Sequence, residues 1–306
     1  MKKLNVIYSP KYLNYGFGSG HPFWPERAFQ FLTKLKNFQF PINTNFQLIR
    51  PKPGKDADIL LVHTKDFLER VKKHAQEGGA LSVDTPVTKE NLEAAYYYVG
   101  GTILASNLAL KGERVINLLG GLHHAGSSTS SGFCIFNDHA IAIRKLQKEG
   151  KIKKAMIFDL DVHAGNGTQE IFYSDSSVFT ISIHQDPTFF YPGTGFSWQK
   201  GEGKGKGYNL NLSLPAGTGE KEYLKALDSV LPLEKKFEQD LVFLILGVDT
   251  YKGDPLAGFK LEKETYQKIG QRFSQFEKLA VLFAGGYSRE TPDLWFKFLE
   301  GYLRKC

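Results

Sequence analysis

Residues 155–163 read AMIFDLDVH, four apolar residues followed by two aspartates and a histidine at every second position. A short, continuous apolar run is typical of a strand that is buried on both faces of a parallel sheet. In extended backbone, residues i and i+2 point to the same side, so Asp161 and His163 are expected to lie next to each other. The sequence therefore predicts a buried strand that ends in a cluster of ligating side chains.

Seven further apolar runs of this kind occur along the chain, and helix-like segments separate most of them. The longest such segment, residues 91–110, has Thr88 or Asn91 available as its N-cap and Gly112 to stop it. This alternation predicts a three-layer α/β/α protein with a central, mainly parallel, eight-stranded sheet. The predicted strands are 4–8, 59–62, 115–118, 155–158, 178–183, 208–212, 241–246 and 280–283, and the other predicted helices are 138–149 and 220–238.

The composition is that of a large globular domain that needs no disulfide. Of the 306 residues, 42% are hydrophobic and 23% are charged, which is ordinary for a globular protein. Neither cysteine, Cys134 or Cys306, belongs to a CxxC pair, and Cys134 is expected to be a small buried hydrophobe. No low-complexity linker divides the chain, so residues 1–306 are predicted to form a single catalytic domain.

The formal charge of +7 is spread along the chain. Scattered lysines without arginine clusters among aromatics predict a solvated basic surface and not a nucleic-acid site. No apolar run approaches the ~18 residues of a membrane span, and the apolar segment after the first lysines is too short for a signal peptide. We therefore expect a cytoplasmic protein without a membrane partner.

Polar side chains follow five of the predicted strands. In open α/β sheets, ligands bind just beyond the carboxyl ends of the strands, so this edge is the expected site. The polar groups there are His123 and His124, Asp161 and His163, His184, Asp249, and Tyr287.

Asp161, His163 and Asp249 are candidate ligands for one divalent ion. Two carboxylates and one imidazole leave positions open for water and substrate, which is the pattern of a catalytic and not a structural metal site. Zinc and ferrous iron both accept these ligands.

Taken together, these motifs resemble the histone deacetylase family, which has the arginase–deacetylase fold. The matching pieces run in the family's order and span nearly the whole chain. They are GHP (20–22), GGLHHA (120–125), SGFC (131–134), DLDVH (159–163), YPGTG (191–195), GVD (247–249), GDP (253–255) and GGY (285–287).

The resemblance implies zinc-dependent hydrolysis of an N-acyl amide, foremost N6-acetyl-lysine in a peptide or protein. The products would be a free amine and a carboxylate. The implied zinc ligands are Asp161, His163 and Asp249, and the implied catalytic residues are His123, His124 and Tyr287.

The implied mechanism is acid–base catalysis at an activated amide. A neutral His124 can take the proton of the attacking water, and Tyr287 can donate a hydrogen bond to the oxyanion. Asp159 would accept from the ring N–H of His123. Asn166 stands where many relatives have an aspartate; its amide oxygen can still accept the ring N–H of His124, but it lacks the charge that favours imidazolium.

The resemblance also implies a monovalent cation, usually potassium, and a tunnel for the acyl-lysine. The implied cation ligands, partly through backbone oxygens, are Asp159, Asp161, His163 and Ser182. The implied substrate contacts are Phe133 and Tyr191 in the tunnel walls, Leu256 at the rim, and Asp84 as the acid that grips substrate backbone amides.

Three alternatives share the fold or its binding site. A two-manganese ureohydrolase would need carboxylates where this chain has Gly165 and Tyr251. A deacetylase of acetylpolyamines or other small amides would favour an acidic residue at the rim. Leu256 at that position favours acyl-lysine, but the sequence leaves both substrate classes open. An inactive acyl-lysine reader would have lost a ligand or Tyr287, and this chain retains them all.

Overall fold

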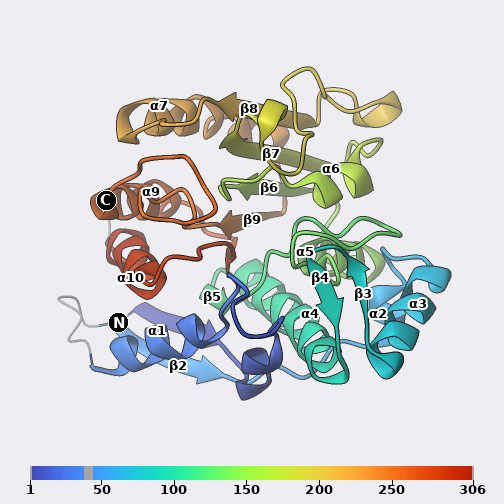
Figure 1. Cartoon of the computed structure of the whole chain (residues 1–306). Coiled ribbons are helices and arrows are strands. Elements are labelled where there is room, and N and C mark those ends of the chain that lie inside the picture. The colour runs from blue at the N-terminus through green and yellow to red at the C-terminus, as the bar shows by residue number, and fades with distance from the viewer. Residues whose placement is uncertain (1, 38–43, 305–306) are drawn as a thin grey trace.

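An eight-stranded, entirely parallel sheet runs through the molecule, from β2 to β8 in Figure 1. The structure is a computed structural model that describes residues 2–37 and 44–304. In order across the sheet, the strands are β2 (Thr44–Ile49), β1 (Lys2–Ile7), β5 (Arg114–Leu118), β10 (Leu279–Phe283), β9 (Leu241–Leu246), β6 (Ala155–Asp159), β7 (Val178–Gln185) and β8 (Asn209–Leu214). A separate antiparallel hairpin pairs β3 (Gly79–Ser82) with β4 (Thr85–Val87).

Helices cover both faces of the sheet. In β9, Val242 and Leu244 belong to one hydrophobic core, whereas Phe243 and Ile245 belong to a second core. This alternation follows from the two-residue period of a strand and confirms the predicted three-layer architecture. Helices α1 (Glu26–Asn37), α7 (Glu220–Val230), α9 (Lys263–Phe273) and α10 (Thr291–Tyr302) pack into the first core, α6 (Asn166–Phe172) into the second, and α4 (Lys89–Leu110) and α5 (Asp138–Lys148) into both (Figure 1).

Helix α3 (Lys65–Glu77) also packs into the first core, through Phe67, Leu68 and Val71. The remaining, short elements are α2 (Asp56–Ile59), α8 (Leu233–Phe237) and the 3₁₀ helices η1 (Pro10–Asn14), η2 (Pro187–Phe189) and η3 (Gly203–Gly205).

One predicted strand was wrong. Residues 59–62 end helix α2 and enter a turn, and the eighth strand is β2 at the sheet edge. Ile59 is apolar because it is buried in a helix, whereas β2 exposes side chains such as Gln47 and Leu48 to solvent. An edge strand of this kind carries no continuous apolar run, so apolar content alone does not reveal it.

The helix predicted over 220–238 is also wrong in one respect, because it is two helices. Helix α7 ends at Val230 and α8 begins after Pro232. Proline lacks a backbone N–H and its ring clashes with the preceding turn, so the helix breaks there. The helix predicted over 91–110 is α4, and both candidate caps act: Thr88 accepts from the backbone N of Asn91, and Asn91 accepts from the backbone N of Thr88.

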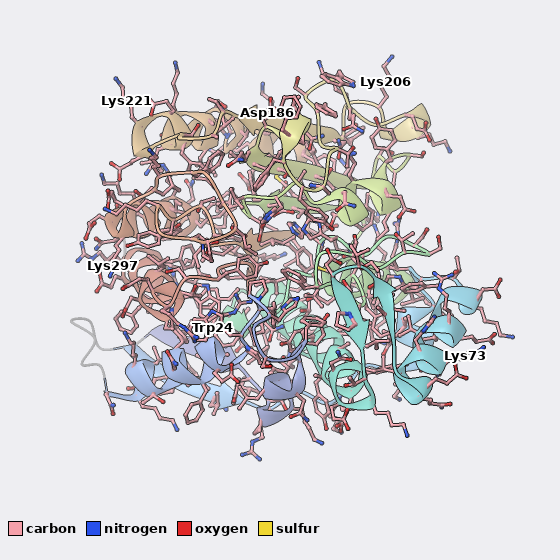
Figure 2. The ribbon with its side chains drawn as sticks, in the orientation of Figure 1. Trp24, Lys73, Asp186, Lys206, Lys221 and Lys297 are labelled. Atoms are coloured by element: carbon pink, nitrogen blue, oxygen red, sulfur yellow. The ribbon has the colours of Figure 1, made fainter. Side chains whose placement is uncertain are left out.

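The described surface agrees with the expected spread of positive charge. Lys73, Lys206, Lys221 and Lys297 point outward from separate parts of the outline in Figure 2. Within residues 2–37 and 44–304, no helix has the length and apolar character to cross a bilayer. Cys134 is buried, as predicted, whereas Cys306 lies outside the described residues.

Candidate functional site

The five strands that carry the candidate site residues are consecutive in the sheet, in the order β5, β10, β9, β6 and β7. Because all five are parallel, their carboxyl ends meet at one edge. Residues distant in sequence, such as His123, Asp249 and Tyr287, are thereby brought together.

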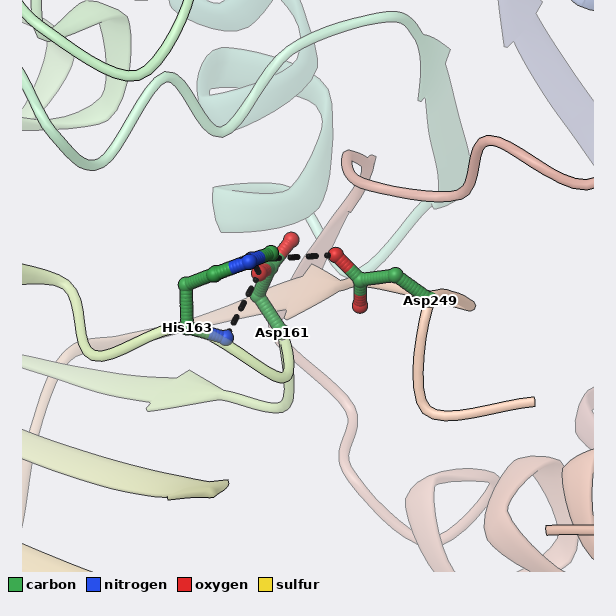
Figure 3. A group of neighbouring side chains, drawn as sticks. All are labelled: Asp161, His163 and Asp249. Atoms are coloured by element: carbon green, nitrogen blue, oxygen red, sulfur yellow. Dashed lines mark hydrogen bonds and ion pairs between the residues drawn. The ribbon is translucent and has the colours of Figure 1, made fainter. Parts of the chain in front are cut away.

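Asp161, His163 and Asp249 converge in one buried cluster (Figure 3). Their candidate ligand atoms all lie within 4.8 Å of one another. His163 Nδ1 lies 3.1 Å from Asp161 Oδ1 and 3.5 Å from Asp249 Oδ2. The other Asp249 oxygen, Oδ1, accepts a hydrogen bond from the backbone N of Val162 at 3.0 Å.

The charges of this cluster fit a divalent cation. Asp249 is completely buried, and its Oδ2 has no hydrogen-bond partner within the described chain. Burial, followed by the neighbouring Asp161 carboxylate, raises the pKa of Asp249 to about 8. Two carboxylates buried this close are costly together unless a cation neutralises them, and the carboxylate–imidazole set suits zinc or iron.

A glycine pair brings the backbone against the cluster. Gly285 N donates to Asp161 Oδ2 at 3.2 Å, and a Cβ at position 285 would overlap the carboxylates of Asp161 and Asp249. Gly286 adopts a φ of +135°, which side chains rarely allow. Both glycines are therefore needed for the turn that leads into Tyr287.

His123 and His124 form a directly contacting pair beside the cluster. His123 Nδ1 lies 2.7 Å from Asp159 Oδ2, and His124 Nδ1 lies 2.6 Å from Asn166 Oδ1. These oxygens accept, so each Nδ1 carries a proton and each Nε2 faces the other, at 3.0 Å. The contacts expected of Asp159 and Asn166 are thus both present.

The two histidines differ in protonation. Burial disfavours the charged form of His123, but the Asp159 and Asp161 carboxylates outweigh it and raise its pKa to about 9. Burial, reinforced by the charges of His123 and His163, lowers the pKa of His124 well below its ordinary value. His124 is therefore the member of the pair that is kept neutral.

A cavity of about 240 Å³ opens beside these groups. Its walls are mainly aromatic: Phe190 stacks on the His163 ring with centroids 4.9 Å apart, and Tyr191 meets the His124 ring edge-on at 4.9 Å. All four residues proposed as substrate contacts line this cavity. Its lining is Asp84, His124, Gly132, Phe133, His163, Phe189, Phe190, Tyr191, Leu256 and Tyr287.

Phe133 is held in a strained conformation. Its φ is +65°, a region that bulky residues adopt only when their surroundings impose it. Thr85 Oγ1 accepts from Phe133 N at 3.1 Å, and Tyr15 Oη donates to Phe133 O at 2.8 Å. The β3–β4 hairpin, which carries Thr85, therefore fixes one wall of the cavity.

Asp84 lies in the turn of the same hairpin. Its Oδ2 accepts from Gly132 N at 3.1 Å, and its Oδ1 accepts from the hydroxyls of Ser82 at 2.6 Å and Thr85 at 2.8 Å. The carboxylate thus supports the cavity wall from the rim, a role that the sequence did not suggest.

Ser182 and His184 connect strand β7 to the loop after it. Ser182 is the register partner of Asp159 on β6, so the two lie side by side. Since the Gly195 carbonyl can only accept, His184 Nε2–H donates to it at 2.7 Å, and Nδ1 accepts from Ser182 Oγ at 2.7 Å. His184 thereby attaches the loop that carries Tyr191 to the sheet.

Three positioning residues were missed at the sequence level, and two of them are buried aspartates. Asp254 accepts from the backbone N of Tyr287 at 2.7 Å, and Asp138 accepts from the backbone N atoms of Gly121 and Leu122 at 3.0 and 2.7 Å. The aspartate of the GDP motif was a signal for Asp254, but spacing alone assigned it no role.

Arg27 is the third missed residue. It is 1% exposed, donates to the Gly286 carbonyl, and lies over the Tyr287 ring with its guanidinium carbon 5.7 Å from the centroid. The sequence did contain one indication of its burial, because Arg27, Phe31 and Leu35 are spaced four residues apart and so lie on the same face of a helix.

Sequence comparisons agree with this geometry. The histone deacetylase domain matches residues 21–300, and the chain belongs to that family. It is 40% identical over 251 residues to a protein named "probable deacetylase" of Methanothermobacter thermautotrophicus, covering 80% of this chain and 75% of the relative. It is 36% identical over 317 residues to acetoin utilization protein AcuC of Bacillus subtilis, covering 96% of this chain and 81% of the relative.

Solved structures show the same architecture. The HDA15 HD domain superposes with a TM-score of 0.89 and 28% identity, covering 97% of this chain and 88% of that chain. An acetylpolyamine aminohydrolase from Burkholderia pseudomallei gives a TM-score of 0.87 at 24% identity, covering 98% of both chains, a likeness that shows the fold alone. The predicted arginase–deacetylase fold is therefore confirmed, and the deacetylase relatives support a hydrolase that acts on amides.

Proposed function

We propose that the protein is a zinc-dependent deacylase that hydrolyses N6-acetyl-lysine in a peptide or protein, giving free lysine amine and carboxylate. The observation that carries this proposal is the convergence of Asp161, His163 and Asp249 next to a histidine pair and an aromatic cavity. Residues 1–306 would act as one catalytic domain.

Asp161, His163 and Asp249 would hold the ion, zinc or alternatively ferrous iron. Such an ion is a Lewis acid that polarises an amide carbonyl and acidifies water. His124 keeps a neutral Nε2 because Nδ1–H donates to Asn166, so it can accept the proton of the attacking water. His123, whose Nε2 lies 3.0 Å from His124 Nε2, can return a proton to the leaving amine.

Tyr287 would stabilise the oxyanion. Its hydroxyl has a pKa raised well above the ordinary value, because burial and then the Asp161 and Asp249 carboxylates disfavour the phenolate. It therefore remains a hydrogen-bond donor at neutral pH, as an oxyanion contact requires. Asp254 and Arg27 hold its backbone and ring in place.

The remaining assignments concern the second ion and the substrate. Asp159, Asp161, His163 and Ser182 would hold potassium, partly through backbone oxygens, and Asp159 and Ser182 lie side by side as register partners on β6 and β7. Phe133 and Tyr191 would enclose the lysine chain between aromatic faces.

The alternatives fit this site less well. A ureohydrolase would need a carboxylate at position 165, where a Cβ would already overlap the Asp159 carboxylate. An inactive acyl-lysine reader would not need the intact histidine pair and Tyr287. A deacetylase of acetylpolyamines or other small amides remains the alternative that shares the chemistry.

The test is hydrolysis by the full-length protein with its metal content measured. We expect zinc-loaded protein to release acetate from acetyl-lysine peptides, and Asp249→Ala to lose both bound metal and activity. Activity that survives in Asp249→Ala with the metal still bound would contradict the ligand assignment. Metal-loaded wild type that hydrolyses no acyl amine would overturn the proposed function.

A further inference from the structure

Phe189 is a fully exposed aromatic residue at the open side of the substrate cavity. Its exposure is 99%, yet it lines the same cavity as His124 and Tyr287. A single exposed apolar residue is common on protein surfaces. An exposed phenylalanine beside a cavity that a substrate fills is different, since the bound substrate can cover it.

The backbone presents Phe189 in a fixed place. Asp186, labelled in Figure 2, accepts from the backbone N of Thr188 at 2.9 Å and begins the 3₁₀ turn η2, in which Pro187 is the first residue. The next residue, Phe190, is anchored by its stack on His163. Little ordering of the chain would therefore be needed for Phe189 to bind a partner group.

The cavity lining favours an apolar neighbour over a cationic one. The described residues that line it include a single carboxylate, Asp84, which can compensate no more than one charge of a polycation. Leu256 lines the cavity as well, where an acid would suit a polyamine. A free acylpolyamine is a flexible polycation and would find little to compensate its charge here.

We propose that Phe189 is a specificity-determining residue that binds an apolar side chain flanking the acyl-lysine. The substrate would then be a polypeptide segment with an apolar residue next to the modified lysine, and not a free acylpolyamine. This inference depends on the proposed deacylase function and adds the substrate class.

The experiment compares substrates with zinc-loaded full-length protein. Acetyl-lysine peptides carrying either Phe or Ser on both sides of the lysine are assayed beside N-acetylspermidine. Covering part of a phenylalanine ring predicts a kcat/KM about five- to tenfold higher for the Phe-flanked peptide, with N-acetylspermidine below both peptides. Phe189→Ser should lower the Phe-flanked value to that of the Ser-flanked peptide.

Trp198→Ser is the matched control. Trp198 is another exposed aromatic, at 70%, but it stacks on Phe196 and is not among the cavity residues, so its loss should leave the preference intact. A preference that persists in Phe189→Ser, or N-acetylspermidine hydrolysed as well as the peptides, would overturn the inference while leaving deacylation established. No hydrolysis of any acyl amine by wild type would instead overturn the proposed function and this inference together.

Discussion

Replacing Thr85 by valine tests whether the Thr85 hydroxyl holds Phe133, the strained residue in the cavity wall, in place. Valine keeps the shape of threonine but removes the hydroxyl that accepts from Phe133 N and donates to Asp84 Oδ1. Thr85 is 0% exposed, so water cannot replace the lost group without rearrangement. The left-handed backbone at Phe133 then loses the hydrogen bond from its N–H and keeps the one that its carbonyl accepts from Tyr15.

The expected loss can be worked from these contacts. The unpartnered N–H of Phe133 costs about 1–3 kcal/mol, and the lost bond to Asp84 costs about 1 kcal/mol. We therefore expect Thr85→Val to lower the free energy of unfolding by about 2–4 kcal/mol. Since Phe133 would leave its strained position, kcat/KM for an acetyl-lysine peptide should fall about tenfold or more.

Thr85→Ser is the control, because it keeps the hydroxyl and loses only a methyl group, at about 1 kcal/mol. Urea denaturation followed by tryptophan fluorescence measures stability, and steady-state kinetics measure kcat/KM. If Thr85→Val matches Thr85→Ser in both quantities, the hairpin does not hold the wall and the reasoning fails.

Further predictions address Tyr287, the number of bound metal ions and the stability of the protein in acid. Tyr287→Phe should lower kcat about 10²–10³-fold with unchanged thermal stability, and a loss under about threefold in steady-state assays would remove it from the oxyanion role. Gly165→Asp should lower the free energy of unfolding by at least about 1–3 kcal/mol from overlap with Asp159, without binding a second metal equivalent by elemental analysis. Burial lowers the pKa of His63 from 6.5 to about 4, so as the pH falls His63 is protonated in the unfolded protein before it is protonated in the folded protein. Its contribution, about 3 kcal/mol, is therefore complete above pH 6.5 and is lost as the pH falls toward 4; His63→Gln should flatten that part of a stability–pH curve, and an unchanged slope would refute the assignment.

Much of the candidate site could be predicted from the sequence because parallel strands impose a simple geometry. Their carboxyl ends share an edge, so His123, Asp249 and Tyr287 had to approach one another once the strands were recognised. The two-residue spacing of Asp161 and His163 then supplied neighbouring ligands, and the structure brings both to Asp249.

Other features were not predicted, and most of them left no pattern in the sequence. Strand β2 is an exposed edge and lacks an apolar run, and the break at Pro232 was overlooked within a helical pattern. The hydrogen bond from Phe133 N to Thr85 Oγ1 joins two residues 48 positions apart, a contact that neither propensity nor periodicity encodes. Arg27 shares a helix stripe with apolar residues, but arginine is mostly exposed in proteins, so its burial was not predicted.

In this fold, the residues proposed for catalysis are positioned by buried groups, whereas the residues proposed for substrate specificity lie on surface elements. The proposed catalytic groups are held by buried carboxylates, because Asp138, Asp159 and Asp254 accept from backbone N–H groups or from a histidine. The open side of the cavity instead includes residues of two surface elements, Asp84 of the β3–β4 hairpin and Phe189 of η2. Exposed side chains on such elements can vary without loss of the core, although a buried one such as Thr85 cannot. The sequence assigned no role to the buried Asp138 and Asp254, and Phe189 is recognised only when its exposure and its place beside the cavity are seen together. A change of substrate within this family would therefore be sought first in those two surface elements.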